Sequence, residues 1–295
     1  MSEPAILAAL SVERVRAHVE HITEKIPSRL AGTENQRRMA EYSARVLRES
    51  GVDATVHQIP GLVSFPERAE LKVLAPVEMT IEANTLGHST LTPPEGISGE
   101  LLDVFSGAFG EFAGQDPIGK ITLSELSYHP ARHEKQRIAA LLGASGCVMM
   151  NWGGPDNAAV PFGSVKPCWG NPTPENVGSE MPVLPCIGIA RTGGLRLREM
   201  ARTGPVRVWF RTHVENGWRP IQVTVGDMPI GDDFVVLGGH QDSWFGPRSG
   251  ESPRSHGRGA PRLRRGVSER WAGGARGGRS SLRFKRWGAI SGPPM

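Results

Sequence analysis

Cysteine is scarce in this chain, with three residues among 295. The number is odd and no two cysteines form a CxxC pair, so the sequence predicts neither a disulfide framework nor a zinc ribbon. Buried free thiols are the expected state of Cys147, Cys168 and Cys186. A loop closed by Cys168 and Cys186 is the alternative, which a reducing compartment disfavours.

Long hydrophobic runs are also missing. No stretch approaches the roughly 20 apolar residues of a membrane span. The run AILAAL is too short for the core of a signal peptide, and the charged SVERVRAH follows it. We therefore expect a soluble, cytoplasmic protein without a membrane span. With 38% hydrophobic residues, the chain has enough apolar surface for a globular core.

Acidic residues are almost absent from the end of the chain. Residues 248–295 hold eleven Arg and one Lys against two Glu, a net charge of +10. Because the whole chain has a net charge of +4, residues 1–247 have a net charge of −6. The low apolar content of residues 248–295 predicts a disordered tail. Such a tail would attract nucleic acid electrostatically, but it has no regular RGG repeat and few aromatic residues, so no specific nucleic-acid partner is predicted.

The first sixty residues show helical and strand patterns. Behind the N-cap Ser11, apolar residues at spacings of three and four predict an amphipathic helix over residues 12–26. Thr33 is placed to cap a second helix, which Gly51 ends. VDATVHQI, residues 52–59, then predicts a strand. This order is typical of the edge of an α/β domain.

Residues 60–218 predict a compact β-rich module. Pro and Gly separate short strand-like segments, namely AELKVLAP, GELLDV, GKITL, GCVMM and PVLPCIGI. Two helices are expected within it, HEKQRIAALL ending at Gly143 and LRLREMA ending near Gly204. PVRVWFRTHV, residues 205–214, alternates apolar and polar residues, which predicts a half-buried antiparallel strand.

The segment DDFVVLGGHQDSW differs from these strands. Phe234–Leu237 is continuously apolar, as expected of a central parallel strand buried on both faces. The β-rich module would then be an insert that splits one α/β domain. His240 would lie at the carboxyl end of this strand, where open α/β sheets bind their ligands.

His240 and Asp242 form a candidate metal-binding pair. Residues two apart in extended chain project to the same side, so the Asp242 carboxylate can accept one ring N–H of His240. Carboxylates orient metal-bound histidines in this way. A buried structural histidine with its own aspartate is the alternative that this spacing alone leaves open.

Several segments together resemble a known family. FVVLGGHQDSW preceded by GDD is similar to the metal-binding strand of co-catalytic zinc peptidases of the aminopeptidase and glutamate carboxypeptidase type. SRLAGTENQRRMAEYSARVLRESGVDATVHQI resembles their N-terminal segment. GISGELLDV, GKITLSEL, IAALLGASGCVMMN and MPVLPCIGIARTGGLRLREM resemble parts of the protease-associated domain that is often inserted between the two. The resemblance covers roughly residues 11–247.

The resemblance implies a zinc-dependent exopeptidase that hydrolyses terminal bonds of peptides with two zinc ions. His240 would be a zinc ligand, and Asp242, as a catalytic-site residue, would orient it. The family takes its other ligands from later residues, but this chain has no Asp after Asp242 and no adjacent Glu pair anywhere. Catalytic zinc needs about three protein ligands. We therefore expect zinc to be weakly bound or absent, and this chain to be truncated and inactive.

After Asp242 the remaining candidate ligands are Glu251, His256 and Glu269. Arg, Gly, Pro, Ala and Ser are what GC-rich DNA encodes in a shifted frame, so a frameshift near Pro247 is one explanation of the tail. An alternative C-terminus and a genuine basic tail are the others. Two further hypotheses for function are a non-catalytic binding module, in which the protease-associated domain recognises a peptide or protein partner, and a nucleic-acid-binding protein acting through its tail.

Other residues of possible interest have simpler interpretations. His129 and His133 have the spacing of a metal pair, but Pro130 places His129 outside the following helix, so we expect surface positions. Three tryptophans are expected to pack or to line the module junction, namely Trp152, Trp169 and Trp244.

The predicted fold class is α/β, with an incomplete zinc-peptidase sheet domain split by a β-rich insert. Residues 1–59 would form the N-terminal part of the peptidase domain and residues 60–218 the protease-associated domain. Residues 219–247 would carry the strand with the HQD motif, and residues 248–295 the basic tail.

Overall fold

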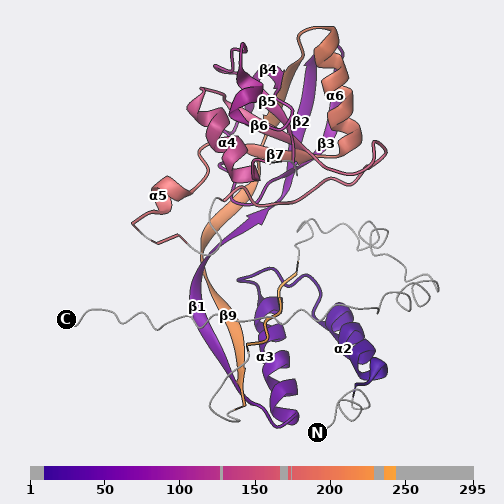
Figure 1. Cartoon of the computed structure of the whole chain (residues 1–295), viewed down its shortest axis with the longest axis vertical. Coiled ribbons are helices and arrows are strands. Elements are labelled where there is room, and N and C mark those ends of the chain that lie inside the picture. The colour runs from indigo at the N-terminus through magenta and orange to yellow at the C-terminus, as the bar shows by residue number, and fades with distance from the viewer. Residues whose placement is uncertain (1–9, 127–128, 167–171, 174, 229–235, 244–295) are drawn as a thin grey trace, which may run out of the picture. The chain divides into compact units, whose positions relative to one another are not determined.

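The computed structural model describes residues 10–126, 129–166, 172–173, 175–228 and 236–243 (Figure 1). All of them lie within Met1–Arg248, the first of the two units into which the chain divides. Within these ranges every helix is too short or too polar to cross a membrane. The predictions for the basic tail, Cys168, Trp169 and Trp244 lie outside the described residues.

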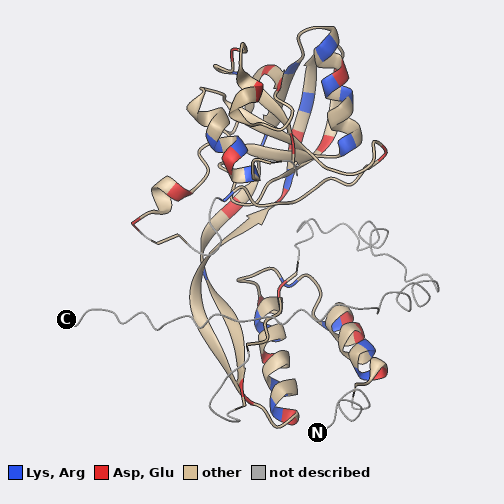
Figure 2. Cartoon of the chain, in the orientation of Figure 1, with Lys and Arg blue, Asp and Glu red and all other residues tan. Residues whose placement is uncertain are grey.

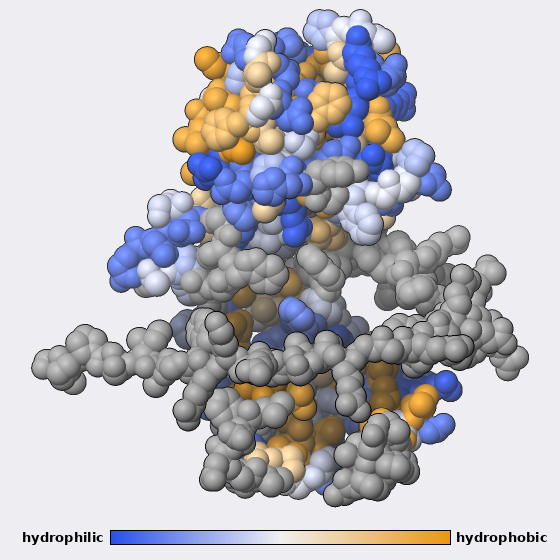
Figure 3. All heavy atoms as spheres, viewed as in Figure 1, coloured by the Kyte–Doolittle hydropathy of each residue, from blue (hydrophilic) through white to orange (hydrophobic). Residues whose placement is uncertain are grey.

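Helix α2, Val12–Lys25, forms where the sequence predicts it. Ser11 caps its first turn, because the Ser11 side chain accepts a hydrogen bond from the Arg14 backbone N–H. None of its residues is buried, and the apolar stripe, here Val12, Val15 and Val19, is more than half exposed. Figure 3 shows apolar side chains at the surface over this helix. The amphipathic pattern therefore predicted the helix, and its apolar stripe is exposed at the N-terminal end but covered at the C-terminal end, where Ile26 is buried.

Helix α3, Glu34–Glu49, is held at both ends by the expected residues. The Thr33 side chain accepts from the Gln36 backbone N–H, and Gly51 has the left-handed φ of 81° that ends helices without strain. Its buried face carries Met39 and two alanines and packs against strands β1, Asp53–Pro66, and β9, Val214–Asp227.

Strands β1 and β9 form a two-stranded antiparallel ribbon along their full lengths, from Asp53 opposite Asp227 to Pro66 opposite Val214. Figure 1 shows them side by side. The sequence predicted a strand at residues 52–59 only, so the ribbon is longer than expected and β9 was not anticipated. The ribbon brings together two chain segments on either side of the β-rich module.

Between the ribbon strands the chain forms a closed barrel in the order β2-β3-β7-β6-β5-β4-β8. Neighbouring strands from β4 to β7 are parallel, and the other pairs are antiparallel. The strands are β2 (Arg68–Ala75), β3 (Met79–Thr85), β4 (Ile97–Asp103), β5 (Ile121–Glu125), β6 (Gly146–Met150), β7 (Cys186–Ile189) and β8 (Arg207–Arg211).

Helices α4, Arg132–Leu141, and α6, Arg191–Thr203, pack on this barrel. Both helices were predicted, and Gly143 and Gly204 follow them as expected. A short helix α5, Val177–Glu180, and a 3₁₀ helix, Phe109–Phe112, complete the regular structure. The fold is therefore mixed α/β with a barrel-like sheet.

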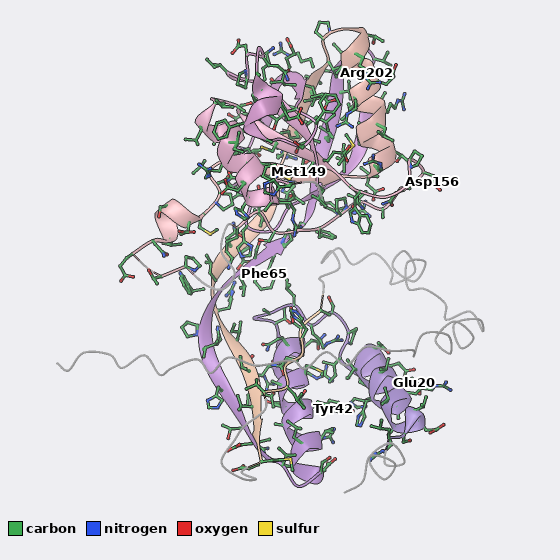
Figure 4. The ribbon with its side chains drawn as sticks, in the orientation of Figure 1. Glu20, Tyr42, Phe65, Met149, Asp156 and Arg202 are labelled. Carbon is green, nitrogen blue, oxygen red and sulfur yellow. The ribbon has the colours of Figure 1, made fainter. Side chains whose placement is uncertain are left out.

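The barrel interior is a dense apolar core. Val206, Val208 and Phe210 alternate into it, as predicted from the sequence pattern, and all three are buried. Val148 and Met150 of β6 also face this core, whereas Met149, labelled in Figure 4, is buried in a second cluster with Ile138 and Ala139 of α4. Cys147 and Cys186 are buried free thiols, as predicted, and are paired in register across β6 and β7. Burial raises the pKa of Cys186 well above its ordinary value.

The buried central strand predicted at Phe234–Leu237 is not found where the structure describes it. Val236 and Leu237 lie in no strand, with 78% and 93% of their surface exposed, and Phe234 and Val235 lie outside the described residues. A parallel strand needs neighbours on both sides to satisfy its backbone. Among the described residues the only sheet outside the barrel is the two-stranded ribbon, and neither of its strands pairs with this segment.

Candidate functional site

His240 and Asp242 are joined by a hydrogen bond. The distance from His240 Nδ1 to Asp242 Oδ1 is 2.8 Å. The His240 side chain is 91% exposed and the Asp242 side chain is 44% exposed. With Nδ1 donating to the carboxylate, the neutral ring keeps its Nε2 lone pair free toward solvent, which is the arrangement of an oriented metal-ligating imidazole. The predicted contact is present, but in an exposed segment instead of at the end of a buried strand.

Gln241, between the pair, anchors the segment to β9. Its Nε2 donates to the Gln222 carbonyl oxygen at 2.6 Å, and its Oε1 accepts from Thr224 Oγ1 at 3.2 Å. The same Gln222 oxygen accepts from Gln36 Nε2 of α3 at 2.6 Å. Gln241 therefore points inward while its neighbours His240 and Asp242 point outward, as alternation along an extended chain requires.

Arg29 anchors the segment from the other side. Its backbone N–H donates to Ser243 Oγ at 2.7 Å, and the Ser243 N–H donates back to the Arg29 carbonyl at 3.1 Å. Its guanidinium Nε donates to the Gln241 carbonyl at 3.2 Å, and Nη1 to the Ile26 carbonyl at 3.0 Å. Burial lowers the pKa of Arg29, and the nearby Asp242 charge opposes that shift.

Sequence reasoning did not find Arg29, Gln36 or Gln241 as parts of this site. The signal available was the SRLAGT turn, which contains Arg29 and Gly32 and which begins the segment that resembles the N-terminal part of the family. Its Gly32 has φ of 78°, and a Cβ there would approach Arg219 Cβ to 2.9 Å. A turn with such close packing indicates a fixed position for its neighbours.

The described residues do not form a complete zinc site. Among them no group of three or more His, Cys, Asp or Glu side chains is close enough to hold a metal ion. Structural and catalytic zinc sites use three or four protein ligands, and His240 supplies one. Three other candidate ligands, Glu251, His256 and Glu269, lie outside the described residues.

The second candidate pair of histidines is not a metal site either. His129 is exposed before α4, and His133 lies in its first turn with Nε2 3.7 Å from Glu134 Oε1. Trp152, which was expected to pack or to line the module junction, is instead exposed. The surface interpretation of this histidine pair agrees with the structure.

A second concentration of charge lies on the barrel. Arg198 of α6 binds Asp103 at the end of β4 and Glu125 at the end of β5, with distances of 2.7 Å and 2.9 Å. Arg191 also binds Glu125, at 2.6 Å. Figure 2 shows basic and acidic residues interspersed along α6. Every charge in this network is paired, so the network ties α6 to the ends of β4 and β5. Arg198 also borders a cavity of about 410 Å³.

No protein-family profile matches the chain, and no curated protein matches it. Solved structures do. The aminopeptidase from Aneurinibacillus sp. strain AM-1 is similar with a TM-score of 0.60 and 18% identity, over 79% of this chain and 53% of that one. The M28 peptidase precursor from Shewanella amazonensis is similar with a TM-score of 0.58 and 20% identity, over 77% of this chain and 53% of that one. The zinc aminopeptidase BSAP from Bacillus subtilis is similar with a TM-score of 0.52 and 18% identity, over 74% of this chain and 47% of that one.

At these identities the likeness defines the fold. The chain has a fold shared with zinc aminopeptidases, and it spans about half the length of these neighbours. The fold expected from the family resemblance is in this respect confirmed.

Proposed function

We propose that this chain belongs to the co-catalytic zinc peptidases and that His240 is a zinc ligand oriented by Asp242. One observation carries the proposal. The Nδ1 to Oδ1 hydrogen bond of 2.8 Å leaves Nε2 of His240 exposed, within a fold shared with zinc aminopeptidases. The intact activity would be hydrolysis of terminal peptide bonds. The neighbours named as aminopeptidases favour the amino-terminal bond.

The domain organisation is part of this proposal. Residues 1–59 and 219–247 contribute to one peptidase domain, and residues 60–218 form an inserted protease-associated domain. The pairing of β1 with β9 supports it, since the two strands flank the closed barrel in sequence and lie side by side in space. An insert that leaves and re-enters its host domain through two paired strands disturbs that domain least.

We further propose that the 295-residue chain is inactive by itself. His240 is a single zinc ligand among the described residues, and the sequence has no Asp after Asp242 and no adjacent Glu pair. Without about three ligands the metal is not retained. Without a positioned carboxylate, no group removes a proton from water or protonates the leaving amine.

The ligand role of His240 is testable in an inactive chain. Adding Zn²⁺ to ¹⁵N-histidine-labelled protein should shift the Nε2 resonance of His240 selectively, because Nε2 is the free nitrogen of an oriented ring. The signal is assigned with His240→Gln. Asp242→Asn should weaken the response, since an amide is a poorer acceptor for the ring N–H than a carboxylate.

His133→Ala is the matched control, because His133 is a surface histidine outside the pair. It should leave the zinc response of His240 unchanged. The proposal fails if zinc perturbs the other histidines while the His240 ring stays unaffected.

A further inference from the structure

The turn between α2 and α3 is held in an unusual conformation. Ser28 has φ of 53°, in the left-handed region that non-glycine residues seldom adopt, and Gly32 has φ of 78°. The Asn35 side chain donates to the Pro27 carbonyl at 2.5 Å and holds the start of the turn. Left-handed backbone at a serine persists only where the surroundings fix it, and such positions concentrate at functional sites.

This conformation presents Arg29, the next residue, to the HQD segment. Arg29 and Ser243 exchange two hydrogen bonds through the backbone of Arg29, and the guanidinium reaches the carbonyl of Gln241. Arg29 therefore holds the residue before Asp242 and the residue after it. The second guanidinium bond, to the Ile26 carbonyl, fixes the Arg29 side chain in turn.

Asp242 lies between these two fixed points, and its carboxylate bonds the His240 ring. The ring is exposed and belongs to a segment without regular secondary structure. Its orientation accordingly depends on where the Asp242 backbone is held. Gln241 holds the segment to β9, and Arg29 holds it to the turn between α2 and α3.

We propose that Arg29 is a positioning residue for the His240–Asp242 pair: its planar fork and backbone hold residues 241–243 so that Asp242 accepts the Nδ1 proton of His240 and leaves Nε2 unprotonated. The inference rests on the proposed function only in that the free Nε2 of His240 is assigned to zinc. The positioning itself is independent of zinc and of peptidase activity.

The test uses the full chain without metal. Ring ¹⁵N shifts of His240, measured at a pH where the ring is neutral, report which nitrogen carries the proton. The wild-type chain should carry it on Nδ1. In Arg29→Met the ratio of the two tautomers should move about fivefold toward the Nε2-protonated form, the equilibrium equivalent of one hydrogen bond.

Arg29→Lys separates charge from geometry. Lysine keeps the positive charge but cannot donate from two fixed nitrogens to two carbonyls, so the tautomer ratio should move nearly as far as in Arg29→Met. Arg202→Met is the matched control, since Arg202 is an exposed arginine of α6 whose side chain bonds Glu199 of the same helix. It should leave the ratio unchanged.

Amide spectra of the barrel residues verify that each variant is folded, and Ser243→Ala, which removes one Arg29 bond, serves if Arg29→Met does not fold. A smaller shift of the ratio in the same direction is expected there. An unchanged tautomer in a folded Arg29→Met chain, or a wild-type ratio in Arg29→Lys, overturns the proposal. Failure of added zinc to perturb the His240 ring would contradict its proposed role as a zinc ligand and leave the tautomer result intact.

Discussion

His88 connects three separate segments of the chain. Its Nδ1 lies 2.9 Å from Ser164 Oγ, its Nε2 lies 3.4 Å from the Leu62 carbonyl oxygen, and its backbone N–H donates to Ser64 Oγ at 2.7 Å. Burial lowers the pKa of His88 to about 4; the Leu62 bond opposes this shift and the charge of Lys166 adds to it. A neutral imidazole therefore joins β1 to the barrel at physiological pH.

Acid should destabilise the fold through His88. The folded pKa of about 4 lies below the ordinary value of 6.5, so the unfolded chain binds more protons between these pH values. The contribution of His88 is complete above pH 6.5 and is lost as the pH falls toward 4. Linkage sets it on the order of 3 kcal/mol. Urea unfolding at about pH 7 and about pH 4.5 measures the loss.

His88→Asn is the matched variant for this prediction. Asparagine tolerates the left-handed φ of 64° found at this position and does not titrate. Its unfolding free energy should fall less between the two pH values than that of the wild-type chain. Equal losses in both proteins would show that other groups carry the acid sensitivity.

At the scale of single residues, the sequence predicted the site only in part. The His240–Asp242 contact follows from the alternation of side chains along two residues, a local rule. Arg29 bonds Gln241 and Ser243, which lie 212 and 214 positions further along the chain. Gln36 bonds Gln222, which lies 186 positions further along. No local pattern specifies such pairs, because they depend on how α3, the SRLAGT turn and β9 come together.

At the scale of elements, α2 and the barrel strands differ in what holds them. Leu123 of β5 is fully buried in the barrel core, whereas Val15 of α2 is exposed. Leu123→Ala should lower the unfolding free energy by about 2–5 kcal/mol, because it removes buried methyl groups and leaves a cavity. Val15→Ala should change it by less than about 0.5 kcal/mol. Urea unfolding of both variants at pH 7 compares the two directly.

A loss at Val15 as large as that at Leu123 would contradict the exposure of the α2 stripe. Alanine also has a higher helix propensity than valine, so a small gain in stability agrees with the structure. The two substitutions together compare an exposed apolar position of α2 with a buried position of the barrel.

Among the elements, helices and Gly- or Pro-bounded strands were predictable, and others were not. α2, α3, α4 and α6 carry clear periodicity and end signals. β3 was missed although Gly87 follows its MTIEANT segment, and β9 was missed because its partner β1 is distant in sequence. The strand predicted at residues 234–237 was wrong for Val236 and Leu237, since an apolar run forms a buried strand only beside neighbouring strands.

At the scale of the whole molecule, zinc binding depends on the number of metal ligands. The chain shares a fold with zinc aminopeptidases but spans about half their length. Within the described residues it offers one exposed, oriented histidine and no group of three ligands. Retention of zinc requires about three protein ligands, so the described residues by themselves do not form a complete zinc centre.

The most direct test is the zinc content of the purified full chain after dialysis against metal-free buffer, measured by elemental analysis beside hydrolysis of an aminoacyl anilide. If the chain is inactive by itself, as proposed, it will hold far less than one zinc ion per chain and show no turnover above that of the His240→Ala variant. Two tightly held zinc ions per chain, with turnover that His240→Ala abolishes and His133→Ala leaves intact, would contradict it.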